Sequence, residues 1–222
     1  MGEDTREAII EATYRALCEH GYGALTMQDI ADEFDRSKSA LHYHYDTKAD
    51  LLTAFLDHLL SDFEERVAAG ADRPPEERLA AFVDWFVFEP DEDERERFHL
   101  ALLELRAQGA FTREYREQLR RSDDLLVETV ADIVADGIDS GAFESVDPEE
   151  TATLIVAALD GARTRQITLR DEGYTDRVRD AVIARVIAPF LAEMTAEEFA
   201  SLGEQSDAFE PMDDERTETE GG

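Results

Sequence analysis

The segment from Thr26 to Leu51 constrains the fold of this chain more than any other. Its first half has apolar residues at spacings of three and four, which predicts a short amphipathic helix. The inward face of that helix consists of Met27, Ile30, Ala31 and Phe34. Thr26 precedes the run, where a threonine hydroxyl satisfies a free backbone N–H group at a helix start. Asp35 and Arg36 then form a turn, and a second short helix is expected from Lys38 to about Tyr43.

Two short helices joined by a turn of this length form a helix-turn-helix, whose second helix presents its N-terminal side chains to base edges in a DNA groove. Leu41 is the inward residue that packs the second helix against Ile30 and Ala31. The outward residues are small, polar or aromatic: Lys38, Ser39, Ala40, His42 and Tyr43. The segment therefore predicts a DNA-binding surface on the outer face of the second helix.

A longer pattern surrounds this motif. It consists of Ile9, Ala12, Gly21-Tyr22, Leu25-Thr26, Ile30-Ala31, Ser37-Lys38-Ser39, Leu41 and the run from Tyr43 to Leu52. In this order and spacing, Ile9 to Leu51 resembles the N-terminal domain of the tetracycline-repressor (TetR) family of transcription regulators. Three residues depart from the pattern, because the family usually has glycine, a small apolar residue and tyrosine where this chain has Asp35, Arg36 and His42.

The resemblance implies which residues contact DNA. Phosphate contacts are implied for Lys38, Thr26, Gln28, Tyr43 and Lys48. Ammonium groups release counterions from DNA, and hydroxyl groups donate hydrogen bonds to phosphates. Ser39 and Ala40 are expected at base edges, where small residues let the helix lie deep in the major groove. The full candidate set is Thr26, Gln28, Arg36, Ser37, Lys38, Ser39, Ala40, His42, Tyr43, His44 and Lys48. A solvated helix face without a ligand is the alternative.

Apolar periodicity predicts helices along almost the whole chain and no strands. The expected helices cover residues 6–20, 27–34, 38–43, 48–69, 75–88, 95–107, 113–139, 148–169 and 175–193. We therefore expect an all-α fold with three parts. Residues 1–47 form a three-helix DNA-binding domain, and residues 48–195 form a larger helical domain for effector binding and dimerisation. Residues 196–222 form an acidic, disordered tail, because they are polar and poor in apolar residues.

Two stretches of the larger domain carry a further resemblance. They are LLELRAQGAF, which ends at Phe111, and VDPEETATLIVAALDGARTR, which begins at Val146. Both resemble a subset of the same family, the choline-responsive betaine regulators and their relatives. This resemblance specifies the architecture of the domain better than it specifies a ligand.

An effector pocket is expected between the helices of the larger domain, since such pockets are mostly apolar with a few polar groups. Its candidate residues are Trp85, Phe86, Phe98, His99, Leu102, Arg106, Phe111 and Tyr115. Ordinary core packing is the alternative for each of them, because aromatic stripes at helical spacing usually belong to a core. The expected effector is a small hydrophobic or cationic molecule, with fatty acyl thioesters, hydrophobic cations and small quaternary amines all open.

A dimer interface is expected on the helices 148–169 and 175–193. Both helices carry an apolar stripe, and small residues on the first let a neighbouring helix approach closely. In the family that the sequence resembles, these two helices pair with their copies in a four-helix interface, so we expect a homodimer. The candidate residues are Ile155, Ala158, Gly161, Ala162, Val182, Val186 and Phe190. Burial within one chain is the alternative.

The net charge of −32 opposes DNA binding at first sight, because nucleic-acid binders normally carry a basic surplus. The chain has only two lysines, however, and both Lys38 and Lys48 fall in the helix-turn-helix segment. A surplus of acidic residues with so little lysine resembles the proteins of salt-accumulating halophiles. At molar salt the Debye length falls to about 3 Å, which screens the repulsion between carboxylates and DNA. An acidic protein without salt adaptation is the alternative.

Other classes of protein receive little support from the sequence. No apolar run is long enough to span a bilayer and the N-terminus does not resemble a signal peptide, so we expect a cytoplasmic protein without a membrane partner. The single cysteine, Cys18, excludes an internal disulfide and fits a structural thiol. His42 and His44 stand two residues apart and point in different directions, so no metal is expected. Because no catalytic motif is present, neither an enzyme nor a cofactor is expected.

These observations predict a homodimeric, repressor-type transcriptional regulator that binds a palindromic operator in double-stranded DNA and is released by a small effector. Each protomer supplies one helix-turn-helix to one half-site. The helix 48–69 starts at the DNA surface and ends in the larger domain, so it is the expected lever between the two sites. The alternatives are a sensor or adaptor that acts through a protein partner, and an activator on the same fold.

Overall fold

The computed structural model describes residues 3–34, 38–87 and 93–203, and the side chains of residues 3–4 and 38–40 lie outside that description. Within these ranges the chain is helical and forms no β-strand, apart from an isolated bridge between Phe143 and Leu191. The expectation of an all-α fold is therefore confirmed.

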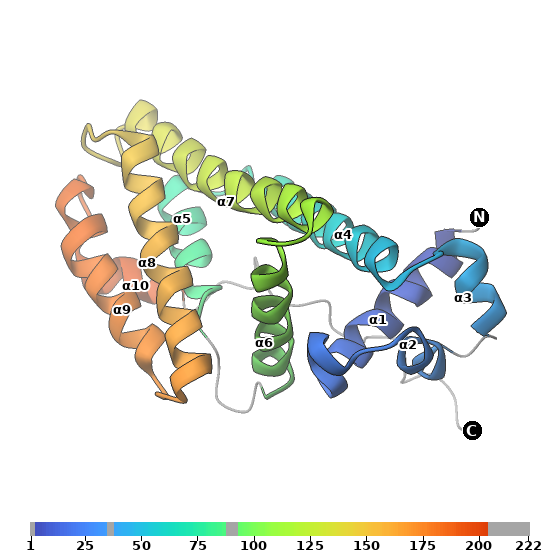
Figure 1. Cartoon of the computed structure of the whole chain (residues 1–222). Coiled ribbons are helices and arrows are strands. Elements are labelled where there is room, and N and C mark those ends of the chain that lie inside the picture. The colour runs from blue at the N-terminus through green and yellow to red at the C-terminus, as the bar shows by residue number, and fades with distance from the viewer. Residues whose placement is uncertain (1–2, 35–37, 88–92, 204–222) are drawn as a thin grey trace, which may run out of the picture.

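The first three helices form a head at one end of the molecule (Figure 1). They are α1 (Glu3–Ala24), α2 (Met27–Glu33) and α3 (Lys38–His44). Ile30 and Leu41 are completely buried, as the amphipathic pattern of this segment predicts. Gly21 interrupts α1 with φ +66°, a backbone conformation that favours glycine, at the residue where the sequence places the end of the first helix.

Hydrogen-bonded caps fix where α2 and α4 (Lys48–Ala69) begin. The Thr26 hydroxyl accepts from the backbone N–H of Asp29 at 3.2 Å, while the Asp29 carboxylate accepts from the backbone N–H of Thr26 at 2.7 Å. Thr47 and Asp50 make the same reciprocal pair at the start of α4. Each pair satisfies donors that a helix start leaves free, so the sequence itself specifies both boundaries.

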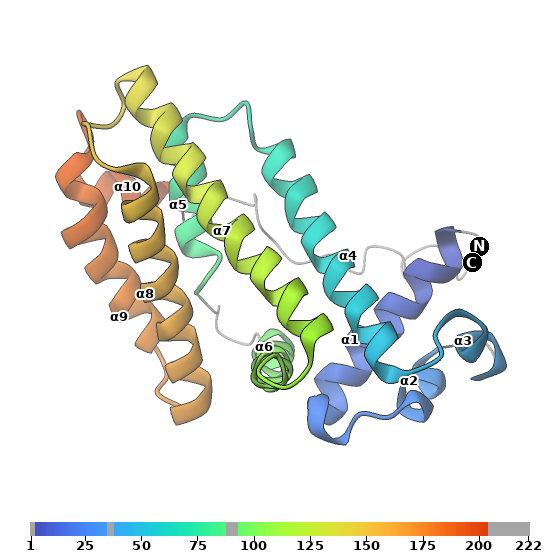
Figure 2. The same ribbon diagram turned by 45° about the horizontal axis from the view of Figure 1, so that its top comes forward.

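The rest of the molecule is arranged around two long helices, α4 and α7 (Arg113–Ser140), which lie side by side (Figure 1). At the end away from the head, α8 (Pro148–Leu169) lies beside α9 (Tyr174–Val182). The shorter α5 (Pro75–Asp84) packs against α7. Figure 2 views α6 (Asp93–Gln108) nearly end-on between the head and α8. Because α6 contacts α1, α7 and α8, it connects the two ends of the molecule.

The predicted helix 175–193 is regular only in its first half. After Val182 the chain forms a wider π-helical turn, Ile183–Ile187, and then a tight 3-10 turn, Ala188–Phe190. Pro189 explains this ending, since proline lacks the N–H group that a helix needs and its ring clashes with the preceding turn.

The prediction of a disordered tail from residue 196 is wrong for its first eight residues, which form α10 (Ala196–Gly203). At the start of this helix the Glu198 carboxylate accepts from the backbone N–H and the hydroxyl of Thr195, and the Thr195 hydroxyl accepts from the backbone N–H of Glu198. Phe199 is completely buried, and α10 packs against α5. Residues 204–222 lie outside the described part of the chain.

Two clusters of buried side chains hold the molecule together. The larger cluster joins α5, α7, α8, α9 and α10. The smaller cluster holds the head, and it also includes Leu51 and Phe55 of α4, Phe98 and Leu105 of α6, and Tyr115 of α7. The core of the head therefore extends past residue 47, because the later helices complete it.

Candidate DNA-binding surface and ligand cavity

The outer face of α3 carries the residues predicted to read DNA. Tyr43 is 84% exposed, His42 is exposed and His44 is half-buried, while Leu41 points inward. Arg36 and Ser37 lie outside the described residues. Lys38, Ser39 and Ala40 lie in the first turn of α3, but their side chains are not among those described.

Thr26 and Gln28, both exposed, take part in bonds to nearby carboxylates. The Thr26 hydroxyl donates to the Asp29 carboxylate at 2.7 Å, and the Gln28 amide donates to Asp32 at 2.6 Å. The bonds from Thr26 lower the pKa of Asp29, which is therefore ionised. A phosphate contact from the Thr26 hydroxyl needs this single donor to exchange the Asp29 carboxylate for the DNA. The contacts of Thr26 and Gln28 with DNA stay predictions.

Lys48 lies at the first position of α4, against the loop between α1 and α2. Its ammonium group donates to the carbonyls of Tyr22 at 2.9 Å and Leu25 at 2.7 Å, and it stands 4.3 Å from the centre of the Tyr22 ring. Burial lowers the pKa of Lys48, against the opposing effect of Asp29 and Glu104. The ammonium group thus ties the end of α1 to the start of α4, and its contact with a DNA phosphate stays a prediction.

A cavity of about 730 Å³ lies between α1, α4, α6, α7 and α8. Small-molecule sites commonly measure roughly 300–1,000 Å³ and are mostly apolar. Apolar side chains from three helices form much of the wall: Phe55, Leu59 and Phe63 of α4, Phe98 and Leu102 of α6, and Leu126 of α7. Five of the candidate pocket residues line this cavity: Trp85, Phe98, His99, Leu102 and Arg106.

The other three candidate pocket residues do not line the cavity. Phe86 is buried in the larger core beside Phe82, at 5.5 Å between ring centres. Tyr115 belongs to the core of the head, where its ring meets that of Tyr22 edge-on at 6.3 Å. Phe111 lies in the turn before α7 and is 85% exposed. Core packing explains the first two, and an exposed turn explains the third.

The sequence prediction missed four arginines that line the cavity: Arg15, Arg66, Arg95 and Arg163. Arg163 is only 6% exposed. The sequence position of Arg163 could have indicated its role, since Arg163 lies on the buried stripe of α8 with Val156, Leu159 and Ile167. An arginine on an apolar stripe costs free energy unless its guanidinium is well bonded, so such a position marks a functional or structural site.

Several polar groups line the cavity wall. His58 lies 3.3 Å from Asp62, whose pKa is raised mainly by burial, and Arg106 bonds Asp123 at 2.6 Å. The pKa of His99 is lowered well below the usual value, mainly by burial and then by the charges of Arg163 and Arg95. His99 is therefore a neutral group at pH 7, able to donate one hydrogen bond and accept another.

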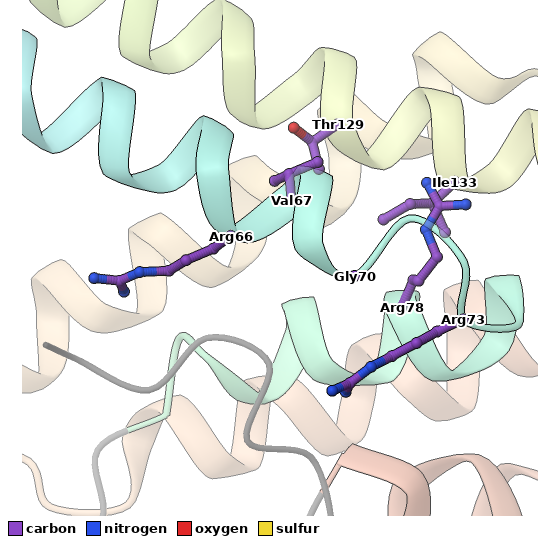
Figure 3. Close-up of a pocket in the computed structure, with 7 residues that line it drawn as sticks. All are labelled: Arg66, Val67, Gly70, Arg73, Arg78, Thr129 and Ile133. Atoms are coloured by element: carbon purple, nitrogen blue, oxygen red, sulfur yellow. The ribbon is translucent and has the colours of Figure 1, made fainter. Parts of the chain in front are cut away.

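A second and much smaller cavity of about 20 Å³ lies between α4, α5 and α7 (Figure 3). It is lined by Arg66, Val67, Gly70, Arg73, Arg78, Thr129 and Ile133. The Arg78 guanidinium bonds the Asp136 carboxylate at 2.7 Å. A water molecule needs about 10–15 Å³ of such space, so this cavity has room for a water and not for an effector.

The structure corrects the candidate dimer interface. Ile155, Ala162, Val182 and Phe190 are buried within a single chain. They belong to the chain's own core and offer no surface to a partner, which was the alternative weighed above. Ala158, Gly161 and Val186 are half-buried.

A different stripe of the same helices faces outward. On α8 it begins at Leu154, which is 54% exposed, and ends at Leu169, which is 69% exposed. Small side chains continue it on both helices: Ala157, Ala158 and Gly161 on α8, and Ala181, Ala184 and Ala188 on the segment that begins with α9. This outward stripe is mostly small and apolar, but the exposed Arg165 interrupts it, since its guanidinium donates to the carbonyl of Gly161 at 3.0 Å.

Metal and membrane sites were also sought. Among the described residues, no three histidine, cysteine or carboxylate side chains gather closely enough to hold a metal ion. None of the described helices combines the length and apolar character needed to cross a lipid bilayer. Cys18 is buried, and its burial raises the pKa of the thiol to about 11, which suits a structural role.

Two family models match this chain. Residues 9–55 match the model described as "Bacterial regulatory proteins, tetR family". Residues 75–192, more than half of the chain, match "BetI-type transcriptional repressor, C-terminal". Among curated proteins, the chain is similar to the HTH-type transcriptional regulator TtgR of Pseudomonas putida, with 39% identity over 57 residues. That alignment covers 26% of this chain and 27% of TtgR, so the chain matches about a quarter of that relative.

Solved structures match over most of the chain. A TetR transcription regulator from Haloarcula marismortui shares 37% identity at a TM-score of 0.73, over 89% of this chain and 97% of that one. A regulator from Saccharomonospora viridis in complex with choline has a TM-score of 0.70 at 23% identity, over 85% and 98%. FadR from Bacillus subtilis, in complex with stearoyl-CoA, has a TM-score of 0.63 at 19% identity, over 79% and 94%. The last two show a shared fold alone.

Proposed function

The chain belongs to the tetR family of bacterial regulatory proteins, and from this premise we propose that it is a DNA-binding transcriptional regulator of the repressor type, controlled by a small molecule. The helix-turn-helix of the head binds DNA, and the 730 Å³ cavity binds the effector. Two relatives of the same fold hold very different ligands, choline and stearoyl-CoA, so relatives alone do not choose the effector of this chain.

The position of helix α6 is the main support for this proposal, because α6 contributes residues both to the cavity and to the core of the head. His99 and Leu102 line the cavity, while Leu105 is buried in the core of the head. The Glu104 carboxylate accepts from the backbone N–H of Gly23 at 3.1 Å, in the segment that leads to α2. A ligand that favours one position of α6 therefore also favours one position of the head, which is a shift between existing populations.

Helix α4 shares this arrangement and supports the lever predicted from the sequence. Leu51 and Leu52 are buried in the core of the head, and Leu59 and Phe63 line the cavity about two to three turns further along. The lever in our proposal therefore consists of both helices, α4 and α6, which meet the ligand from different walls.

We further propose that two chains pair through the outward stripe of α8 and α9, and that the dimer binds a palindromic operator. Leu154, Ala157 and Gly161 lie on that stripe. Small side chains let two helices approach closely, and an exposed apolar stripe favours a partner. A closed twofold pair would present one head to each half-site, with half-sites about 34–36 Å apart or a multiple of that distance.

The test is selection of binding sites from a random duplex library by the full chain in molar KCl. The expected result is an enriched palindrome, and a dimer in light scattering that Leu154→Glu converts to a monomer with weaker DNA binding. Tyr43→Ala, at the exposed face of α3, should also weaken binding, whereas Phe111→Ala, equally exposed but in the turn before α7, should not. A dimeric protein that enriches no sequence at any salt concentration would contradict the proposal and favour a protein partner.

A further inference from the structure

The wall of the large cavity includes part of the DNA-binding head. Helix α1 lies against α6 (Figure 2) and lines the cavity with Ile10, Glu11, Tyr14 and Arg15. Ile10 is buried, whereas Glu11 and Arg15 are exposed, so this side of the wall runs from the core to the surface. The sequence predicts a pocket between helices of the larger domain, and the structure adds the first helix of the head to it.

Much of the cavity wall belongs to the core of the head. Four residues are buried in that core and also line the cavity: Ile10, Phe55, Leu56 and Phe98. Four more pack against the same core and line the cavity: Tyr14, Leu59, Leu102 and Leu119. The core of the larger domain reaches the wall through Phe63, Trp85 and Leu126. A ligand in this cavity therefore touches both cores.

Three aromatic rings from three helices form the part of the wall next to α1. The ring centres of Tyr14 and Phe98 are 4.6 Å apart, and Phe98 meets Phe55 edge-on at 6.0 Å. Aromatic pairs at such separations attract each other, so they hold α1, α4 and α6 together. Tyr14 is only half-buried, which leaves part of its ring available to a ligand.

The chemistry of this part of the wall favours an apolar ligand. Its rings and aliphatic side chains offer contact area and few hydrogen bonds. Elsewhere in the wall, charged side chains have partners within the protein, since Arg106 bonds Asp123 at 2.6 Å and His58 lies 3.3 Å from Asp62. A ligand recognised through its charge would compete with such pairs, whereas an apolar ligand leaves them intact.

The size of the cavity favours a large ligand. A molecule in liquid water occupies about 30 Å³, so 730 Å³ has room for roughly two dozen atoms of that size. Ligands in pockets bury most of their surface. A ligand with only a few non-hydrogen atoms would leave most of the apolar wall uncovered. The space therefore suits a hydrocarbon chain or ring system of roughly ten or more carbon atoms.

We propose that the effector is a mainly apolar molecule that binds directly against α1 of the DNA-binding head. Ile10 and Tyr14 are then ligand-contacting residues, and the head forms one wall of the effector site. Apolar surface that the ligand buries on α1 stabilises the position that α1 takes here, which shifts the population of head positions. This inference rests on the proposed function, since it takes the cavity to be the effector site.

The first test is a fluorescence titration of the full chain in molar KCl with N-phenyl-1-naphthylamine, an uncharged probe that brightens in apolar surroundings. Ile10→Ala and Tyr14→Ala should each weaken binding about five-fold or more, because each removes apolar area that the probe covers. The control is Leu17→Ala, which truncates a buried residue of the same helix and the same core that does not line the cavity. It should stay within about two-fold of the wild type, and circular dichroism shows which variants fold.

The second test detects contact with α1 without truncating a side chain. Trp85 is the sole tryptophan of the chain, so Tyr14→Trp combined with Trp85→Phe moves the tryptophan signal to α1. Bromine quenches a tryptophan that it touches, and chlorine does so much less. We expect 1,8-dibromooctane to quench this variant and 1,8-dichlorooctane, of similar shape, to leave most of its signal. Phe111→Trp in the same Trp85→Phe background, in an exposed turn outside the cavity wall, should keep its signal with both probes.

Quenching decides the question if the truncated variants unfold or the two tests differ. Equal signals with the bromine and chlorine probes bound to Tyr14→Trp would place the ligand away from α1 and overturn the inference. So would the absence of saturable binding of every probe.

DNA binding is a separate readout. A protein that selects an operator but holds its probes away from α1 keeps the proposed function and loses this inference. A protein that binds the probes against α1 and selects no operator does the reverse, so the two failures can be told apart.

Discussion

At the scale of single residues, His99 links the cavity to the pH dependence of stability. Its pKa is well below 6.5 in the folded protein and close to 6.5 in the unfolded chain. Below pH 6.5 the unfolded chain takes up a proton that the folded protein does not, so His99 makes the free energy of unfolding fall as pH falls. His99→Gln removes this effect. From pH 7.5 to 5.5 the wild type should lose about 1 kcal/mol more than the variant.

The measurement is urea unfolding of both proteins across this pH range at constant salt. The carboxylates of the chain change stability in both proteins alike, so the difference between the two curves isolates His99. Identical curves would mean that His99 takes up its proton in the folded protein as readily as in the unfolded one, against the positive surroundings described above.

Lys48 combines a structural contact with a predicted DNA contact. Lys48→Ala leaves the carbonyls of Tyr22 and Leu25 without their charged donor, which should cost about 1–3 kcal/mol of stability. It should also weaken binding to all DNA sequences alike and reduce the salt dependence of binding by about one phosphate contact. Unfolding curves test the first effect, and mobility shifts at several KCl concentrations test the second. Unchanged affinity would remove Lys48 from the DNA surface but leave its tie between α1 and α4 intact.

At the scale of elements, α10 completes the core of the larger domain. Phe199 is fully buried, so Phe199→Ala should destabilise the protein by about 3–5 kcal/mol. Phe111→Ala removes the same ring from an exposed turn and should change stability by less than about 0.5 kcal/mol. Thermal melting of both variants, followed by circular dichroism, gives the comparison. Similar melting temperatures for the two variants would show that α10 is not part of the folding unit.

The sequence predicts most elements correctly because local signals define them. Thr26 and Thr47 cap the starts of α2 and α4, and Gly21 interrupts α1 where a glycine conformation is required. The start of α10 carried such a signal too, a threonine followed three residues later by Glu198, within a very acidic segment. The periodicity of the sequence does not reveal what Phe199 packs against, because its partner lies on α5, more than a hundred residues earlier.

Site residues are harder to predict, because a helix can be apolar on more than one face. On α8, Ile155 points into the chain's own core and Leu154 points outward, and the two are neighbours in sequence. The periodicity of the sequence reveals both apolar stripes, but it does not show which stripe is buried within the chain and which stays exposed. The cavity shows the same limit, since Phe98 lines it and Phe111 does not, although the sequence presents both as rings near helix ends.

At the scale of the whole molecule, the charge of −32 dominates the dependence on salt. The Debye length is about 30 Å at 0.01 M salt, so carboxylates over the entire surface repel one another, and about 3 Å at 1 M, where only adjacent ones do. Repulsion of this kind destabilises the compact state. We therefore expect the helical circular-dichroism signal to weaken, and the melting temperature to fall, when salt is dialysed away. The helix-turn-helix should bind its operator only where salt screens the acidic surface.

The shape of the salt curve distinguishes screening from other effects of concentrated salt. The Debye length shortens most steeply at low salt concentration. If screening is the cause, most of the rise in melting temperature should therefore occur below about 0.5 M KCl, and the melting temperature should change little above that concentration. Exclusion of solutes from the protein surface instead grows steadily with concentration, and sucrose produces it without screening any charge. Melting curves in KCl and in sucrose therefore separate the two causes. A melting temperature that stays constant from low to molar KCl would show that repulsion between surface carboxylates does not destabilise this fold. That result would contradict the interpretation of the acidic surface as an adaptation to salt.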